Sequence, residues 1–295
     1  MHNQVNGFLK YLIIERDTSS NTIVKYKSDL YNLCTFLYQH FKISDFEQVK
    51  IEYLRDYLAH IKINCNLKTS SLSNKISVIK SFFRYLYTSK IINDNPTELI
   101  RLPKKSKTIP KFLNDIELAK LLSAPERVTS KIAKRFIIRD RLILTMLAYT
   151  GLRKSELLNL DWDDVNLGLK YLIVRNTKNR IDRTVPLHSK ISELLDSYLT
   201  QRLPITNKAI IIGKKGTRLS KNSLDRLFKK YLKMSNLSQK GYTLHSLRHT
   251  FATRLLRKNV SLVKIKNLLG HKSIESTEIY LHTTGKELED SINLL

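Results

Sequence analysis

Glycine is nearly absent from the first hundred residues, where Gly7 is the only one. Apolar residues in this stretch recur every three or four positions, which places them on one side of a helix rather than on alternate faces of a strand. Helices are predicted for the run that follows Asn21, for residues 51–61 and for residues 69–87. The N-terminal part of the chain is therefore expected to be all helical.

A segment rich in proline and basic residues follows this helical part. Residues 101–110 contain Pro103 and Pro110, with basic side chains between them and little apolar content. Such a composition is typical of a connector between domains. We expect an N-terminal helical domain over residues 1–103, a linker over residues 104–110 and a second domain over residues 111–295. The basic linker could lie along a phosphate backbone or serve only as a solvated connector.

The second domain mixes helices with short strands. Residues 170–174 and 183–187 alternate like strands around a turn-forming stretch, which predicts an antiparallel hairpin. Helices are predicted over residues 112–122, 133–149, 155–160, 189–201, 221–234, 244–258, 261–269 and 274–281, with a short tail helix over 285–295. The expected fold class is mainly α with a small antiparallel β-sheet of two or three strands.

Charge is the unusual part of the composition. The chain carries 52 Lys and Arg residues against 26 Asp and Glu residues, a net charge of +26. This excess suggests an anionic partner, with nucleic acid ahead of a membrane surface and of basic drift without a partner. We see neither a secretory leader nor a span of about 18 apolar residues, and expect a cytoplasmic protein. Cys34 and Cys65 form neither a disulfide framework nor a zinc pattern.

Common enzyme signatures, such as a glycine-rich phosphate loop or a zinc-binding HExxH helix, are missing from the sequence. The clearest local signal is T-L-H-S-L-R-H-T at residues 243–250. On a helix, His245 and Arg248 share a face, and an imidazole beside a guanidinium can hold one phosphate. Taken alone, the pair fits the start of an ordinary surface helix better than a phosphate site.

Two further segments add to this pair. The stretch T-G-L-R-K-S-E-L at residues 150–157 places Arg153 after a helix-ending Gly151 and before a helix start that favours an anion. Glu156, three residues on, can orient that guanidinium. Downstream, His271 stands at another helix end and Tyr280 follows nine residues later.

This ordered set resembles the tyrosine site-specific recombinases of the phage integrase family. The resemblance covers residues 111–295, and the N-terminal helices and linker look most like the Xer-type branch. It implies a two-domain clamp around duplex DNA, in which residues 1–103 form a core-binding domain and residues 111–295 form an α+β catalytic domain.

The resemblance also implies roles for particular residues. Arg153 and Arg248 would clamp the scissile phosphate, and Glu156 would support them. His245 would assist proton transfer and hold the phosphate, and His271 would donate a hydrogen bond to it.

Lys178, in the predicted hairpin, would protonate the departing 5′-oxygen. The family often has glycine beside this lysine, whereas Thr177 and Asn179 flank it here, which indicates a modest change in loop stiffness. Arg175 and Arg180 are the competing basic groups for this role.

Tyr280 would attack phosphorus and form a 3′-phosphotyrosyl bond, with no cofactor and no metal ion. The implied partners are double-stranded DNA and a homo- or hetero-tetramer of recombinase protomers. From its apolar residues, we hypothesise that the tail after Tyr280 docks onto a neighbouring protomer; the alternative is that it packs on its own domain or frays. Chromosome-dimer resolution and mobile-element integration or excision both fit. The alternatives are a tyrosine topoisomerase and a catalytically silent DNA-binding protein.

Overall fold

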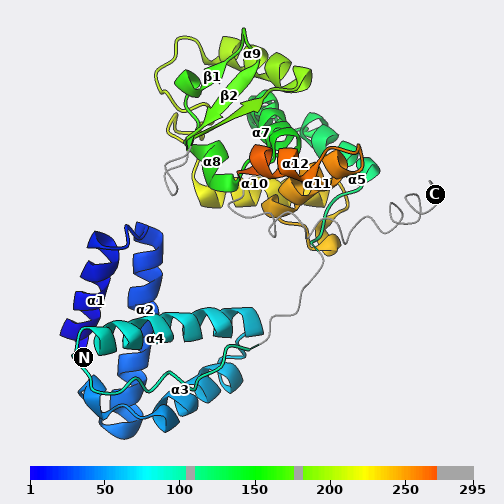
Figure 1. Cartoon of the computed structure of the whole chain (residues 1–295). Coiled ribbons are helices and arrows are strands. Elements are labelled where there is room, and N and C mark those ends of the chain that lie inside the picture. The colour runs from blue at the N-terminus through cyan, green and yellow to red at the C-terminus, as the bar shows by residue number, and fades with distance from the viewer. Residues whose placement is uncertain (104–109, 176–181, 271–295) are drawn as a thin grey trace, which may run out of the picture. The chain divides into compact units, whose positions relative to one another are not determined.

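The computed structural model describes residues 1–103, 110–175 and 182–270 (Figure 1). It divides into two compact units, Met1–Lys107 and Thr108–Leu295. The predicted linker lies outside the described residues except for Pro110, so its boundaries stay predictions. Within the described ranges, no helix is both long and apolar enough to span a membrane.

The N-terminal unit is helical, as predicted. Its core is built on aromatic rings, because Phe8, Phe46, Phe82 and Phe83 are almost completely buried and Phe82 lies 4.8 Å from Phe46 and 5.3 Å from Phe8 between ring centroids. These contacts join the first and last helices of the unit to the short connection between its middle two. The helices are α1 (His2–Ile14), α2 (Ser20–Phe41), α3 (Ile51–Ile63) and α4 (Thr69–Thr88), with a 3-10 turn at Phe46–Gln48.

The second unit contains the described helices α5 to α12 and a three-stranded sheet. The helices are α5 (Asp115–Ser123), α6 (Lys131–Lys134), α7 (Ile137–Thr150), α8 (Lys154–Asn159), α9 (Ser189–Arg202), α10 (Lys221–Met234), α11 (Leu244–Leu256) and α12 (Leu262–Leu269). The strands are β1 (Val165–Asn166), β2 (Tyr171–Val174) and β3 (Arg183–Pro186).

The sheet confirms the predicted antiparallel hairpin. Its strand order is β1-β2-β3, and Val174 pairs with Arg183 at the end of β2. Alternate residues of β2 and β3, including Leu172 and Val185, are buried against the helices. The two chain ends that flank residues 176–181 therefore lie side by side.

Helix α7 forms the centre of the second unit. Ten of its fourteen side chains are buried, so it is enclosed by other elements on nearly every side. It packs against α9 on one side and α11 on another. Figure 1 shows the sheet and α9 at one end of the unit and α8, α10, α11 and α12 at the other.

Most helix bounds differ from the predicted ones by only one or two residues, but two differences are larger and have a clear physical reason. Helix α5 begins at Asp115 rather than near residue 112, because the Asn114 side chain accepts a hydrogen bond from the amide of Glu117 and caps the helix. The single helix predicted over residues 133–149 is two helices, α6 and α7. Phe136 has non-helical dihedral angles between them, and the Arg139 guanidinium lies 4.3 Å from the centre of its ring.

Candidate active site

The candidate site is built where the end of α7 lies against α11 and the end of α12. Gly151 ends α7 with a left-handed φ of +64°. A Cβ atom at this position would lie 2.5 Å from Cδ1 of Phe251 on α11 and 2.7 Å from Cδ2 of Leu269 on α12. Glycine therefore serves both the turn and the packing, and it brings the main chain at the end of α7 between α11 and α12.

Arg248 on α11 links the ends of α7 and α12. Only 1% of the residue is exposed. Its Nη1 atom donates to the carbonyl oxygen of Gly151 at 2.6 Å, and its Nη2 atom donates to the carbonyl oxygen of Leu269 at 2.6 Å. A charge this deeply buried needs such acceptors because desolvation is otherwise very costly. Arg248 stands out in the sequence, but its burial does not follow from any local pattern.

Arg153 lies at the start of α8, immediately after this turn. Its Nη1 atom donates to Oε1 of Glu156 at 2.6 Å, and its backbone amide donates to Oε2 of the same carboxylate at 2.8 Å. The contact that the three-residue spacing allows is thus present. The Arg153 side chain stays 38% exposed, whereas that of Glu156 is 10% exposed. The Arg153 guanidinium can therefore contact a ligand on its exposed side while the buried Glu156 carboxylate fixes its position.

Glu156 has a second cationic partner, Arg183, which the sequence analysis missed. The Nη2 atom of Arg183 donates to Oε2 at 2.7 Å, and its Nη1 atom donates to Oε1 at 3.2 Å. Burial alone would raise the pKa of Glu156, but hydrogen bonds from Arg183 and from Arg153 outweigh it and lower the pKa to about 2. A sequence signal did exist, because Arg183 shares a strand face with the buried Val185, and a charge on a buried face needs a partner.

The last carbonyl groups of α12 accept hydrogen bonds from three arginines. Leu268 accepts from Nε of Arg183 at 2.9 Å, Leu269 from Arg248, and Gly270 from Nη2 of Arg153 at 3.2 Å. The C-terminal end of a helix carries partial negative charge, so guanidiniums are well placed there. Three guanidiniums and one carboxylate meet at this point, and the described chain stops at Gly270, one residue before His271.

His245 lies on α11, one turn before Arg248, and its side chain is exposed. Partial desolvation and the positive charges of Arg248 and Arg153 lower its pKa. A lowered pKa keeps the imidazole neutral at physiological pH, so it can accept a proton. Its ring centre lies 4.7 Å from that of His249, one turn further along the helix.

Acid should destabilise the second unit partly through His249. Burial first, and then the nearby His245 and Arg248, lower the pKa of His249 from 6.5 to about 4. The unfolded chain binds a proton here below about pH 6.5, and the folded chain binds one only near pH 4, so the free energy of unfolding falls as the pH drops through this interval. Thermal melts across the interval should show a shallower fall for His249→Gln. If the melting temperatures of the unmodified protein and of His249→Gln depend on pH in the same way, His249 does not contribute to the acid destabilisation.

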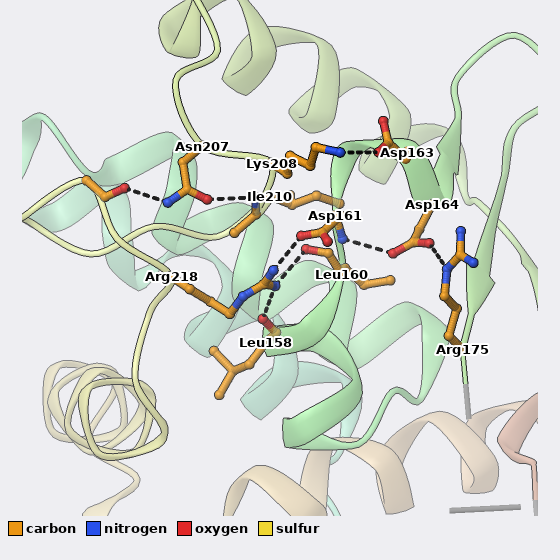
Figure 2. Close-up of polar contacts among 12 residues, drawn as sticks. Leu158, Leu160, Asp161, Asp163, Asp164, Arg175, Asn207, Lys208, Ile210 and Arg218 are labelled. Atoms are coloured by element: carbon orange, nitrogen blue, oxygen red, sulfur yellow. Dashed lines mark hydrogen bonds and ion pairs between the residues drawn. The ribbon is translucent and has the colours of Figure 1, made fainter. Parts of the chain in front are cut away.

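The two chain ends next to residues 176–181 are each held by a carboxylate. Arg175, after β2, donates from Nε to Oδ1 of Asp164 at 2.6 Å, and Asp164 also accepts from the amide of Asp161 at 2.9 Å (Figure 2). Hydrogen bonding to Asp164 raises the pKa of Arg175 and makes it a poorer proton donor. At the other end, Arg183 begins β3. Lys178 lies between them, outside the described residues.

In the described part of the site, Arg153, Arg183 and Arg248 thus meet at the end of α12, Glu156 accepts hydrogen bonds from Arg153 and Arg183, and His245 lies one turn before Arg248. Such a group can bind a phosphate and stabilise added negative charge on it. Among the described residues, no three His, Cys, Asp or Glu side chains gather in a group that could hold a metal ion. Of the other predicted site residues, His271 and Tyr280 lie outside the described ranges, as do Lys178 and Arg180.

Comparison with protein-family models gives two matches. The model of the "Phage integrase family" matches residues 111–287, and that of the "Phage integrase, N-terminal SAM-like domain" matches residues 5–90.

Curated proteins and solved structures resemble the chain over its whole length. The tyrosine recombinase of Pseudothermotoga lettingae is 34% identical over 100% of this chain and 99% of that protein. Tyrosine recombinase XerC of Pelotomaculum thermopropionicum is 32% identical over 98% of this chain and 96% of that protein. The crystal structure of XerH site-specific recombinase bound to palindromic difH substrate, a post-cleavage complex, has a TM-score of 0.77 and 22% identity, covering 99% of this chain and 84% of that one.

Proposed function

Because the chain belongs to the phage integrase family and is a tyrosine recombinase, which cleaves and rejoins DNA, we propose that Tyr280 forms its covalent bond to DNA. In this reaction the phenolic oxygen of Tyr280 attacks the scissile phosphorus. A bond between that oxygen and phosphorus forms, and the bond between phosphorus and the 5′-oxygen breaks. The phenol loses its proton, the 5′-oxygen gains one, and nothing is oxidised or reduced. The phosphodiester energy is kept in the 3′-phosphotyrosyl bond, so the strand can be rejoined without a nucleotide cofactor.

The proposal assigns Arg153 and Arg248 to the scissile phosphate. The observation that carries it is their convergence on the consecutive carbonyl groups of Leu269 and Gly270, directly before His271. The transition state carries more negative charge than the substrate, and donors fixed in advance stabilise it preferentially. His245, kept neutral by its lowered pKa, would accept the tyrosine proton, and His271 would donate a hydrogen bond to the phosphate.

Lys178 is proposed to give the proton to the departing 5′-oxygen. A lysine ammonium is a stronger acid than an arginine guanidinium, so it gives a proton to an alkoxide more readily. Hydrogen bonding to Asp164 raises the pKa of Arg175 further. Arg175 is also engaged by Asp164. Both facts favour Lys178 over Arg175, while Arg180 remains the second candidate.

Double-stranded DNA is the proposed partner. The basic composition, with a net charge of +26, supports it, and the structurally similar XerH is seen bound to a DNA substrate. Residues 1–103 would bind the core site, with the linker along the backbone. Strand exchange between two duplexes requires four protomers, so we propose a tetramer acting in the cytoplasm. Its members are either identical, as in a homo-tetramer, or of two kinds, as in a hetero-tetramer.

One assay separates the proposed function from its alternatives. A suicide DNA substrate, nicked near the cleavage position so that the strand cannot be rejoined, is incubated with the protein. A covalent adduct together with recombinant product on an intact pair of sites supports the recombinase. Adduct and supercoil relaxation without recombination would support a topoisomerase, and binding without adduct would support a silent DNA-binding protein.

Cleavage is expected to continue in excess EDTA. Arg153, Arg248 and Lys178 supply positive charge to the phosphate, which is the part that divalent ions play in other phosphoryl-transfer sites. The rate of adduct formation on the suicide substrate should be the same with EDTA and with added magnesium. A strict magnesium requirement in the chemical step would contradict the proposed site.

A further inference from the structure

We propose that Arg183 is a positioning residue that fixes Glu156, and through it the guanidinium of Arg153, in the orientation that binds the scissile phosphate. The inference rests on the proposed function, because it takes Arg153 to contact the phosphate. Arg183 opens β3, and its side chain is 11% exposed. No part of the sequence pattern assigned it a role.

Every guanidinium nitrogen of Arg183 is engaged inside the protein. Two of them form a fork on the Glu156 carboxylate, and Nε donates to the carbonyl oxygen of Leu268 at 2.9 Å. All three contacts are to protein groups, namely the carboxylate that also binds Arg153 and the end of α12. Arg183 therefore acts on the reaction through the groups that it holds, and not as a catalytic residue.

Glu156 transmits the effect to Arg153. Each of its oxygens accepts one bond from Arg153 and one from Arg183. The fork from Arg183 fixes the plane of the carboxylate, and this plane decides where Oε1 directs the partly exposed guanidinium of Arg153. Without the two hydrogen bonds from Arg183, the carboxylate can rotate, and the guanidinium of Arg153 then leaves the orientation that binds the scissile phosphate.

Arg183 also packs directly on the end of α12. A Cβ atom at Gly270 would lie 2.9 Å from Nη1 of Arg183, so the turn and the guanidinium fit closely. The contact to Leu268 holds the turn whose next two carbonyl groups accept from Arg248 and Arg153. One strand residue thus sets the position of the helix end that both proposed clamp arginines contact.

The first test compares Arg183→Gln and Arg183→Lys with Arg153→Ala in the full-length protein. Single-turnover cleavage of the suicide substrate is measured beside binding to one half-site. Loss of a supporting hydrogen-bond partner commonly costs about 10- to 100-fold, and we expect a cleavage loss in this range for Arg183→Gln. Arg183→Lys should recover only part of it, because an ammonium cannot form the fork. Half-site binding should stay within a few-fold, which shows that the variants fold.

A second substrate distinguishes positioning from general damage. It carries a methylphosphonate at the scissile position, where a neutral methyl group replaces one charged non-bridging oxygen. With less charge to stabilise, cleavage depends less on an aligned Arg153. The losses caused by Arg153→Ala and by Arg183→Gln should therefore both shrink on this substrate, and by similar factors.

Arg218→Gln is the matched control. Arg218 resembles Arg183 in its contacts, since it donates to the carboxylate of Asp161 at 2.5 Å and to the carbonyl oxygen of Leu158 at 2.7 Å (Figure 2), but neither Glu156 nor α12 is among these partners. The Arg218→Gln protein should cleave the ordinary substrate at nearly the normal rate, and any change in rate should be the same on the methylphosphonate substrate.

The outcomes separate the inference from the proposed function. If Arg183→Gln cleaves the ordinary substrate at the normal rate, the positioning role is wrong and the proposed function stands. The same holds if Arg183→Gln reduces the cleavage rate by the same factor on both substrates while the reduction by Arg153→Ala is smaller on the methylphosphonate. If Arg153→Ala itself cleaves the ordinary substrate normally, the assignment of Arg153 to the phosphate is wrong, and the inference falls with it.

Discussion

With Tyr280 replaced by phenylalanine, covalent attachment to DNA is expected to fall by at least about 10⁴-fold, because the variant lacks the attacking oxygen. Binding to a half-site should stay within a few-fold, since one hydroxyl contributes little contact area. The measurement is adduct formation on the suicide substrate, with half-site binding followed in parallel.

Tyr242→Phe is the matched control for this prediction. Tyr242 lies shortly before His245 in the chain, but its hydroxyl donates to Oε2 of Glu117 at 2.8 Å. Burial and this hydrogen bond raise the pKa of Tyr242 to about 12, which makes it a poor nucleophile. Tyr242→Phe should therefore cleave normally. Adduct formed by Tyr280→Phe, or lost in Tyr242→Phe, would contradict the assignment of the nucleophile.

The second large effect is expected at Arg248. Arg248→Lys should reduce cleavage by at least about 100-fold, the scale for removing one transition-state donor. A lysine cannot reach the carbonyl groups of Gly151 and Leu269 with the spread of a guanidinium, so one of these buried acceptors loses its partner. We also expect a loss of stability of about 1–3 kcal/mol, measurable by thermal or urea unfolding.

Arg254→Lys provides the comparison on the same helix. Arg254 lies nearly two turns further along α11 and pairs with Asp115 at 3.0 Å, with 31% of its side chain exposed. Its substitution should leave cleavage nearly unchanged. Near-normal cleavage by Arg248→Lys would argue against a forked contact to phosphate.

Elements with strong periodic patterns could be predicted from the sequence. Helix α10 has the predicted bounds, and α4 differs from its prediction by one residue, because an apolar stripe at helical spacing specifies a buried face. The breaks that were missed depend on tertiary contacts. The separation of α6 from α7 at Phe136 accompanies the stacking of Arg139 on its ring, which no local pattern records.

The same distinction holds within the site. The contact between Arg153 and Glu156 follows from a spacing of three residues, so the sequence suggests it. Arg183 reaches the same carboxylate from 27 residues away, and the tertiary packing that places β3 beside α12 makes that contact possible. The burial of Arg248 also ran against expectation, because a charged residue is seldom fully buried unless tertiary structure supplies its acceptors.

Tyr280 is the residue proposed to become covalently attached to the cleaved DNA strand. Trypsin cleavage after Lys272 and Lys286 releases residues 273–286, in which Tyr280 is the only tyrosine. The trapped adduct is digested with nuclease and trypsin, and the modified peptide is identified by mass spectrometry. We predict a nucleotide attached through its 3′-phosphate to Tyr280 in this peptide. Attachment to any other peptide, or through a 5′-phosphate, would contradict the account.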